Sequence, residues 1–185
     1  LHERGVLQHD LHPGNILLHP DTGEMRLVDL HGTIIKPDLT QAERDSNLAF
    51  LRIFLPVPVS PDIAKRSAAM RRQYLSKRAW RCLKHNREFE PRAAGGMRWF
   101  VRRPLVDEQT TKILADPDGF LAREAEILKP GRSCTVGRSG GLVLKRFNLR
   151  KLGNLAKDFF RLSKARRAYQ KAYHLEIAGV PTARA

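Results

Sequence analysis

Three oxygen-bearing side chains near the start of the chain have the types and the spacing for phosphoryl-transfer chemistry. Asp10 and Asn15 stand five residues apart, Pro13 and Gly14 bend the chain between them, and Asp29 follows further on. Phosphoryl transfer needs one carboxylate beside the acceptor hydroxyl, and it needs oxygen ligands that hold magnesium against the phosphates. These three residues are therefore the first candidates for a functional site.

The elements around these residues must bring them together. Very short strands are predicted at 6–8, 16–18 and 25–28. The segment Pro20-Asp21-Thr22-Gly23 between the last two strands is typical of a hairpin turn. A hairpin over 16–28 would return the chain antiparallel, so that Asp29 arrives beside Asn15, and Gly32 would let the backbone turn away. The sequence therefore predicts that all three side chains converge on one space.

The segment from His9 to Asn15, followed by Asp29-Leu30-His31-Gly32, resembles the catalytic loop and the Asp-Phe-Gly metal motif of the protein-kinase-like superfamily. Its form Asp-Leu-His-Pro-Gly-Asn is similar to that of small-molecule, antibiotic and lipopolysaccharide kinases. The resemblance implies Asp10 as catalytic base, with Asn15 and Asp29 as metal ligands. It also places His12 where typical protein kinases have a lysine, in contact with the γ-phosphate or the loop backbone. Gln8 stands where the family has its first histidine.

Two alternatives to this interpretation come from the same residues. One is a hydrophilic loop and hairpin whose Asp and Asn side chains only make turns. The other is a zinc hydrolase, because five of the seven histidines precede residue 32: His2, His9, His12, His19 and His31. Against zinc, His9 and His12 are three apart on a Pro-Gly loop, whereas a metalloprotease needs them four apart on a helix.

Helices are predicted to follow the hairpin. Thr40-Gln41-Ala42-Glu43 is a capping box that opens a helix to about Leu55. Within it, the segment 44–51 resembles the one that packs under the site in lipopolysaccharide kinases. A long basic helix is expected from Pro61 to about Leu83, irregular structure over 86–104, and a short helix from Pro117 to about Leu128.

The last third of the chain carries a second resemblance. Strands are predicted at 133–136 and 142–147, around a glycine-rich turn, and basic helices at about 150–162 and 164–178. The Lys-Arg-Phe-Asn run at 145–148, the arginine-rich helix and Gly-Val-Pro-Thr at 179–182 resemble the start of the bacterial lipopolysaccharide (Kdo/heptose) kinase family.

The second resemblance implies nucleotide-binding roles. Lys145 would hold the α- and β-phosphates of ATP, and residues 130–133, with Gly131 and Ser133, would form a shortened phosphate-covering loop. Ala168 stands near the position of the lysine's glutamate partner, and Glu176 lies about two helical turns further on. If no glutamate reaches Lys145, we expect this part to bind nucleotide poorly or not at all.

The order of the two resemblances predicts the domain organisation. In a kinase the lysine-bearing small lobe precedes the catalytic loop, whereas here the order is reversed. We therefore expect an incomplete protein-kinase-like α+β fold in tandem. Residues 1–105 would be the C-terminal part of one large lobe, and residues 106–185 would be linker helices and the start of a second small lobe. A circularly permuted single unit is the alternative.

Charge and composition bear on partners. The net charge of +15 lies mainly in residues 64–103 and 131–185, each with 13 basic and 2 acidic side chains. Such blocks attract phosphates. Nucleic acid is not the expected partner, because no reading motif or aromatic stacking platform is present. Cys82 and Cys134 lack metal-ligand spacing, and the absence of a signal-like or membrane-spanning segment predicts a cytoplasmic chain.

Together these features predict an ATP- and Mg²⁺-dependent phosphotransferase of the lipopolysaccharide-kinase type. Its acceptor would be a sugar hydroxyl on an acidic lipid-linked glycan, which places the enzyme in the cytoplasm or peripherally on the inner face of the bacterial inner membrane. The alternatives are an aminoglycoside- or choline-type small-molecule kinase and a degenerate kinase-like binding module without activity.

Overall fold

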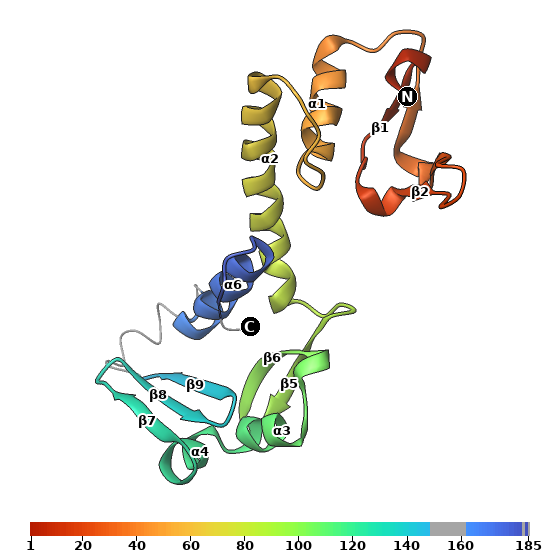
Figure 1. Cartoon of the computed structure of the whole chain (residues 1–185). Helices are drawn as coiled ribbons and strands as arrows, with labels where there is room; N and C mark the ends of the chain where they lie inside the picture. The colour runs from red at the N-terminus through yellow and green to blue at the C-terminus, as the bar shows by residue number, and fades with distance from the viewer. Residues whose placement is uncertain (149–161, 183, 185) are drawn as a thin grey trace. The chain divides into compact units, whose positions relative to one another are not determined.

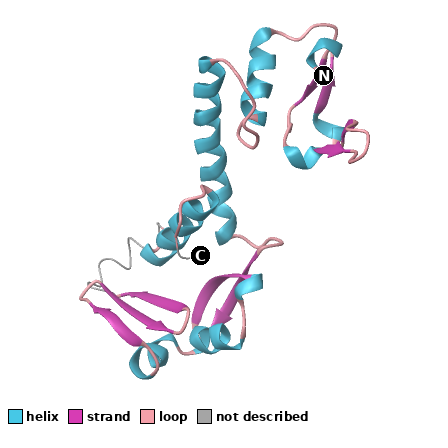
Figure 2. Cartoon of the chain, in the orientation of Figure 1, coloured by secondary structure: helices cyan, strands magenta, loops and turns pink. Residues whose placement is uncertain are grey.

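The computed structural model describes residues 1–148, 162–182 and 184. The chain is mixed α+β with small antiparallel sheets (Figures 1 and 2). It forms two compact units, unit 1 from Leu1 to Tyr74 and unit 2 from Leu75 to Ala185, and the boundary falls inside helix α2. The predicted division after residue 105 concerns kinase lobes rather than compact units, and it stays a prediction.

Unit 1 contains two antiparallel strand pairs, β1 with β4 and β2 with β3. Its strands and helices are η1 (His2–Arg4), β1 (Val6–Gln8), η2 (Pro13–Asn15), β2 (Ile16–Leu18), β3 (Met25–Leu27), η3 (Leu30–Gly32), β4 (Thr33–Ile35), α1 (Gln41–Leu51) and the first part of α2 (Pro61–Ala79). The three predicted strands and their hairpin are confirmed, whereas β4 was not predicted. The buried core consists of Leu7, Leu11, Leu39 and Ala49.

A glycine makes the β1–β4 pairing possible. Gly5 has φ of 66°, and its carbonyl oxygen accepts a hydrogen bond from Lys36 N, just after β4, at 3.0 Å. A Cβ at Gly5 would collide with the carbonyl oxygen of Lys36. The pairing that holds β1 therefore requires a residue without a side chain at this position.

Helix α1 begins with the predicted capping box. Thr40 Oγ1 accepts from Glu43 N at 3.3 Å, and Glu43 Oε2 accepts from Thr40 N at 2.8 Å. A hydrogen bond from Lys36 Nζ and those from Thr40 lower the pKa of Glu43 to about 2. Because the folded pKa is depressed, this carboxylate stabilises the fold above its unfolded pKa, and the contribution is lost as pH falls toward about 2. The helix ends at Leu51, earlier than predicted.

Unit 2 contains a hairpin of β5 and β6 and a three-stranded sheet in the order β7-β8-β9. After the end of α2, its elements are η4 (Trp80–Leu83), β5 (Phe89–Ala94), β6 (Met97–Arg102), η5 (Arg103–Leu105), α3 (Glu108–Ala115), α4 (Pro117–Arg123), β7 (Glu126–Pro130), β8 (Cys134–Ser139), β9 (Leu142–Phe147) and α6 (Lys164–Ile177). Helix α6 and its Ser163 cap were predicted and are confirmed.

Two local predictions in unit 2 are wrong. The segment 86–104 is not irregular but forms the β5–β6 hairpin, with Gly95 and Gly96 at positive φ in its turn. Pro91, which pairs with Phe100, hid the strand pattern, because proline lacks a ladder donor and is usually confined to edge strands. The helix from Pro117 ends at Arg123 and not near Leu128, since β7 follows.

The predicted helix at about 150–162 lies almost wholly outside the described residues.

The core of unit 2 lies where η4, β5 and α6 meet. Cys82, Phe89 and Tyr173 are fully buried, and the rings of Phe89 and Tyr173 pack edge to face with centroids 4.9 Å apart. Burial raises the pKa of the Cys82 thiol to about 12. Arg102 closes this core, since its guanidinium lies 2.5 Å from Glu88 and 2.6 Å from Glu176. Strand β6 and helix α6 are thus joined by an ion-pair bridge beside aromatic packing.

Within residues 1–148 and 162–182, the helices are all too short or too polar to cross a lipid bilayer.

We expect Phe89→Ala to destabilise unit 2 by about 3–5 kcal/mol, because the substitution opens a cavity where a fully buried ring packs against Cys82 and Tyr173. The free energy of unfolding would be measured by urea titration followed by circular dichroism. Val143→Ala is the matched control, since Val143 is 58% exposed, and it should cost less than about 0.5 kcal/mol. Equal losses for the two variants would contradict the assigned core.

Candidate functional site

A single buried side chain connects two of the predicted site residues. Gln8, the last residue of β1, is fully buried, and its Oε1 accepts from Asp10 N at 3.3 Å. Its Nε2 donates to the carbonyl oxygen of Asp29 at 2.9 Å. One amide therefore links the backbone of Asp10 to the backbone of Asp29, although 21 positions separate Gln8 from Asp29.

Asn15 joins the same network. Its side chain is buried, and its Nδ2 donates to the carbonyl oxygen of Asp10 at 3.0 Å. Its own carbonyl oxygen accepts from Val28 N at 3.0 Å, so the residue before Asp29 is bonded to Asn15. Among the described residues, the Oδ1 atom of Asn15 has no hydrogen-bond partner. The structure thus links the backbones of Asp10, Asn15 and Asp29 through main-chain and amide hydrogen bonds.

Asp29 has an unusual backbone conformation. Its φ of 57° and ψ of 58° are left-handed, and no other described residue except glycines has positive φ. For an L-residue this region costs on the order of 1 kcal/mol, although Asp tolerates it better than most. Such strain persists where neighbouring structure imposes it, often at functional sites. Here Gln8 holds the carbonyl group of Asp29, and the side chain turns toward His31, whose Nδ1 lies 2.6 Å from Oδ1.

His12 caps the loop that carries Asp10 and Asn15. Its Nδ1 accepts a hydrogen bond from Gly14 N at 3.0 Å. The family resemblance implies a contact of His12 with either the γ-phosphate or the loop backbone, and this bond is a contact with the loop backbone. Its Nε2 lies 3.6 Å from Asp10 Oδ2, and its ring lies 5.8 Å from the ring of Phe54. A Cβ on Gly14 would lie 2.8 Å from the His12 ring. A side chain at position 14 would therefore displace the His12 ring from its position in this turn.

The donor set of this site suits magnesium. Asp29 offers a carboxylate and Asn15 an amide oxygen, and Mg²⁺ usually takes one or two such ligands while it keeps water and phosphate oxygens. In the part of the chain that the structure describes, no three His, Cys, Asp or Glu side chains could hold a metal together. The side chains of Asp10 and Asp29 are 59% and 54% exposed, so a ligand can reach both.

The early histidines do not converge as a zinc site would require. His2 Nε2 lies 2.9 Å from Asn47 Oδ1, and His19 Nδ1 accepts from Asp21 N and Thr22 N at 3.3 Å. His12 and His31 have the separate partners described above. The structure therefore lends no support to the zinc alternative.

Helix α1 supports the site from behind. Asn47 is 5% exposed, and its Nδ2 donates to the carbonyl oxygen of Gln8 at 2.6 Å. This bond fixes the end of β1, from which Asp10 follows. Asn47 lies in the segment 44–51 that is expected to pack under the site, but the sequence predicts no positioning role for either Asn47 or Gln8. The only sequence signal for Gln8 was its place in the family pattern.

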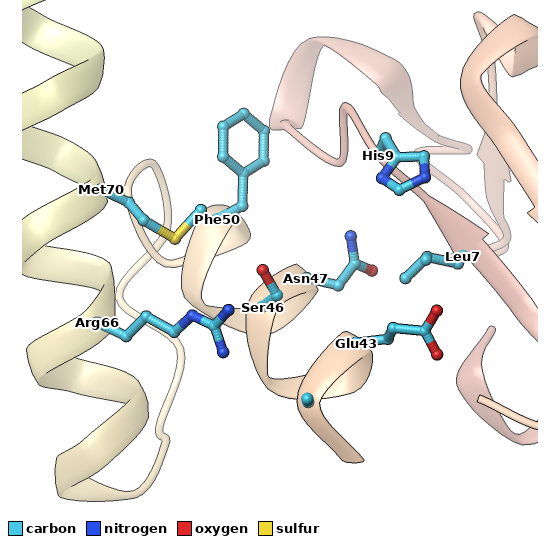
Figure 3. Close-up of a pocket in the computed structure, with 9 residues that line it drawn as sticks. Leu7, His9, Glu43, Ser46, Asn47, Phe50, Arg66 and Met70 are labelled. Carbon is cyan, nitrogen blue, oxygen red and sulfur yellow. The ribbon is translucent and has the colours of Figure 1, made fainter. Parts of the chain in front are cut away.

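A groove of about 490 Å³ lies between β1 and the two helices of unit 1. In Figure 3, Arg66 and Met70 reach from α2 toward α1. The residues that line the groove are Leu7, His9, Ala42, Glu43, Ser46, Asn47, Phe50, Arg66 and Met70. Since none of Asp10, Asn15 and Asp29 is among them, the groove is separate from the candidate phosphoryl-transfer site.

The predicted nucleotide-binding residues lie in unit 2. Lys145 is an exposed residue of β9, opposite Val136, and its Nζ lies 5.1 Å from the ring centroid of Phe147. Among the described residues it has no ion-pair partner. Glu176, the nearest glutamate to the expected partner position, instead lies 2.6 Å from Arg102.

Asn148 organises the predicted phosphate-covering loop. Its Nδ2 donates to Gly131 O at 2.8 Å, and its backbone N donates to Ser133 O at 3.1 Å. A Cβ at Gly131 would lie 2.7 Å from the carbonyl oxygen of Cys134. The structure thus holds Gly131 and Ser133 against the end of β9. The family pattern ends in Asn148 but implies no role for it, and its position after Phe147 is the only signal in the sequence.

The strain at Asp29 leads to a stability prediction. We expect the free energy of unfolding of Asp29→Gly to exceed that of Asp29→Ala by about 1 kcal/mol, because glycine adopts a left-handed backbone conformation without a steric cost. Urea titrations of both variants measure the difference.

Asp21→Gly and Asp21→Ala are the matched control pair, since Asp21 is exposed and has no positive φ. There the glycine variant should be no more stable than the alanine variant. The same order at both positions would show that the conformation of Asp29 is not imposed by the fold.

Comparison of the chain with protein-family models, with curated proteins and with solved structures gives no match.

Proposed function

We propose that unit 1 carries the phosphoryl-transfer centre of a protein-kinase-like enzyme of the lipopolysaccharide-kinase type. The observation that carries this proposal is the buried Gln8 amide, which hydrogen-bonds to the backbones of both Asp10 and Asp29. Together with the bond from Asn15 to the Asp10 carbonyl, it links the backbones of the residues that would supply a carboxylate for the acceptor and a carboxylate and an amide for the metal. A loop that only made turns would not require this arrangement.

In the proposed reaction, each residue has one task. Asp10 accepts a hydrogen bond from the acceptor hydroxyl and takes its proton as the oxygen attacks the γ-phosphorus of ATP, with ADP as the leaving group. Asp29 and the Oδ1 atom of Asn15 would hold Mg²⁺, which neutralises charge on the phosphates. His12, through Nε2 near Asp10 Oδ2, orients the base, and its cap on Gly14 fixes the loop.

The proposed acceptor is a sugar hydroxyl on an acidic lipid-linked glycan, at the inner face of a bacterial inner membrane. The basic character of the chain supports an acidic acceptor, since all of the net charge of +15 resides in unit 2, which has 25 basic and 10 acidic residues. The Asp-Leu-His-Pro-Gly-Asn motif is shared with kinases of small molecules, so an aminoglycoside- or choline-type acceptor is the alternative within the same chemistry.

A second candidate function applies to unit 2 alone, namely a kinase-like binding module without nucleotide turnover. The observation that favours it is the pairing of Glu176 with Arg102 rather than with Lys145. A lysine without a carboxylate partner is less firmly positioned for the α- and β-phosphates. In this case the tandem arrangement would combine one catalytic unit with one binding unit.

We expect Asp10→Asn to lower kcat by at least about a hundredfold, as is typical for loss of a general base. The measurement is phosphate transfer from ATP in a chain that contains the complete kinase-like unit. The affinity for ATP should change little, because Asp10 acts on the acceptor. Asp21→Asn, in the exposed hairpin turn, is the control and should leave kcat unchanged. An unaltered kcat in Asp10→Asn would remove Asp10 as the base.

We expect Asp29→Ala to abolish the magnesium-dependent part of nucleotide binding, because it deletes the only carboxylate proposed as a metal ligand. Isothermal titration with ATP, in the presence of Mg²⁺ and then of a chelator, separates this part from the rest. Asp21→Ala serves as the control. If Asp29→Ala still binds ATP more tightly with magnesium than without it, the metal assignment is wrong, whether or not the variant retains phosphotransferase activity.

A further inference from the structure

The two units differ sharply in charge. Unit 1 has 9 basic and 9 acidic residues, whereas unit 2 has 25 basic and 10 acidic residues. A compact unit with this excess repels itself and attracts polyanions over distances of about 10 Å at moderate ionic strength. Unit 2 is therefore where a specific contact with an anionic partner would be expected.

Two arginines of unit 2 converge on one aromatic ring. The guanidinium carbon of Arg98, in β6, lies 5.5 Å from the ring centroid of Phe100. The guanidinium carbon of Arg166, in α6, lies 5.3 Å from the same centroid. Arg98 and Phe100 lie on the same face of β6, because side chains two positions apart in a strand share a face. The hairpin and the helix thus contribute one guanidinium each to the surroundings of a shared ring.

A third arginine on this face of β6 has carboxylate partners, in contrast to Arg98 and Arg166. Arg102, two positions after Phe100, is neutralised by Glu88 at 2.5 Å and by Glu176 at 2.6 Å. Among the described residues, no carboxylate pairs with Arg98 or Arg166. Two like charges gathered at one ring without counter-charge repel each other, and a bound anion would relieve that repulsion. Guanidinium groups match the oxygens of a phosphate in geometry as well as in charge.

We propose that the face formed by Arg98, Phe100 and Arg166 binds phosphate groups at the surface of an anionic phospholipid bilayer. Arg98 is exposed and Arg166 is half-buried, and a lone phosphate held by such arginines in water gains little. A bilayer presents many phosphates at once to a unit with 15 excess positive charges. This proposal does not depend on phosphoryl transfer in unit 1.

Nucleic acid fits this face less well than a bilayer does. Proteins that bind single strands combine basic grooves with aromatic rings on which bases stack. The Phe100 ring already has two guanidinium groups over it, and the indole nitrogen of Trp99 donates to Ala94 O at 3.1 Å within the hairpin. The face therefore offers charge and hydrogen-bond donors for phosphates but little free ring surface for bases.

The test is binding of the full chain to vesicles of equal parts phosphatidylcholine and phosphatidylglycerol, measured by co-sedimentation without ATP. We expect Arg98→Gln/Arg166→Gln to weaken binding about thirtyfold, since each arginine near an anionic surface contributes about a factor of five. The matched control is Arg92→Gln/Arg138→Gln. It removes the same charge from two exposed arginines that are paired with Glu90 and Glu126, and it should weaken binding less than threefold.

Three outcomes would overturn the proposal. Equal losses in the two double variants would mean that only net charge matters. A soluble phosphate would be the ligand if inorganic pyrophosphate displaced the original chain from vesicles but had no such effect on Arg98→Gln/Arg166→Gln. Tighter binding of an RNA oligonucleotide than of vesicles, with the same dependence on both arginines, would indicate nucleic acid. If the double variant fails to fold by circular dichroism, Arg98→Gln against Arg92→Gln makes the same comparison, with about a fivefold difference expected.

Discussion

The hydrogen bonds of the Gln8 side chain are the constraint on which the candidate site depends. The amide is fully buried, so each of its polar atoms needs a partner, and it finds them in Asp10 N and Asp29 O. Because the donor and the acceptor of one amide are fixed relative to each other, the two backbones cannot move independently. Asn47 adds a bond to the Gln8 carbonyl from α1, so the strand end is held from the helix side as well.

This constraint explains how a strained aspartate is maintained on an exposed surface. Asp29 adopts a left-handed backbone conformation that a free loop would leave, and Gln8 keeps its carbonyl in place. His12 has a similar effect on the preceding loop, where its bond to Gly14 N sets the turn between Asp10 and Asn15. The carboxylates of Asp10 and Asp29 remain exposed, while the Gln8 and Asn15 side chains that bond to their backbones are buried. This division between buried support and exposed function is what a pre-organised site requires.

Unit 2 achieves its stability in a different way, through one aromatic core with an ion-pair bridge. Arg102 spans Glu88 and Glu176 beside the packed rings of Phe89 and Tyr173, and so joins the β5–β6 hairpin to α6. This bridge has two consequences for function. It pairs Glu176 with Arg102 instead of Lys145, and within the described part of the chain it leaves Arg98 and Arg166 without a carboxylate partner. The proposals of a binding role and of a phosphate-binding face both follow from that distribution of carboxylates.

The sequence alone determined the short-range features of the protein. Strands β1, β2 and β3, the capping box at Thr40 and the Ser163 cap of α6 were predictable, because each depends on residues within a few positions. The β5–β6 hairpin was missed, since Pro91 masks its alternation. Only the tertiary structure decided that Gln8 bonds to Asp29, that Asn47 supports β1 and that Glu176 pairs with Arg102. These contacts join residues 21, 39 and 74 positions apart, and no local pattern encodes the partner of a polar side chain over such separations.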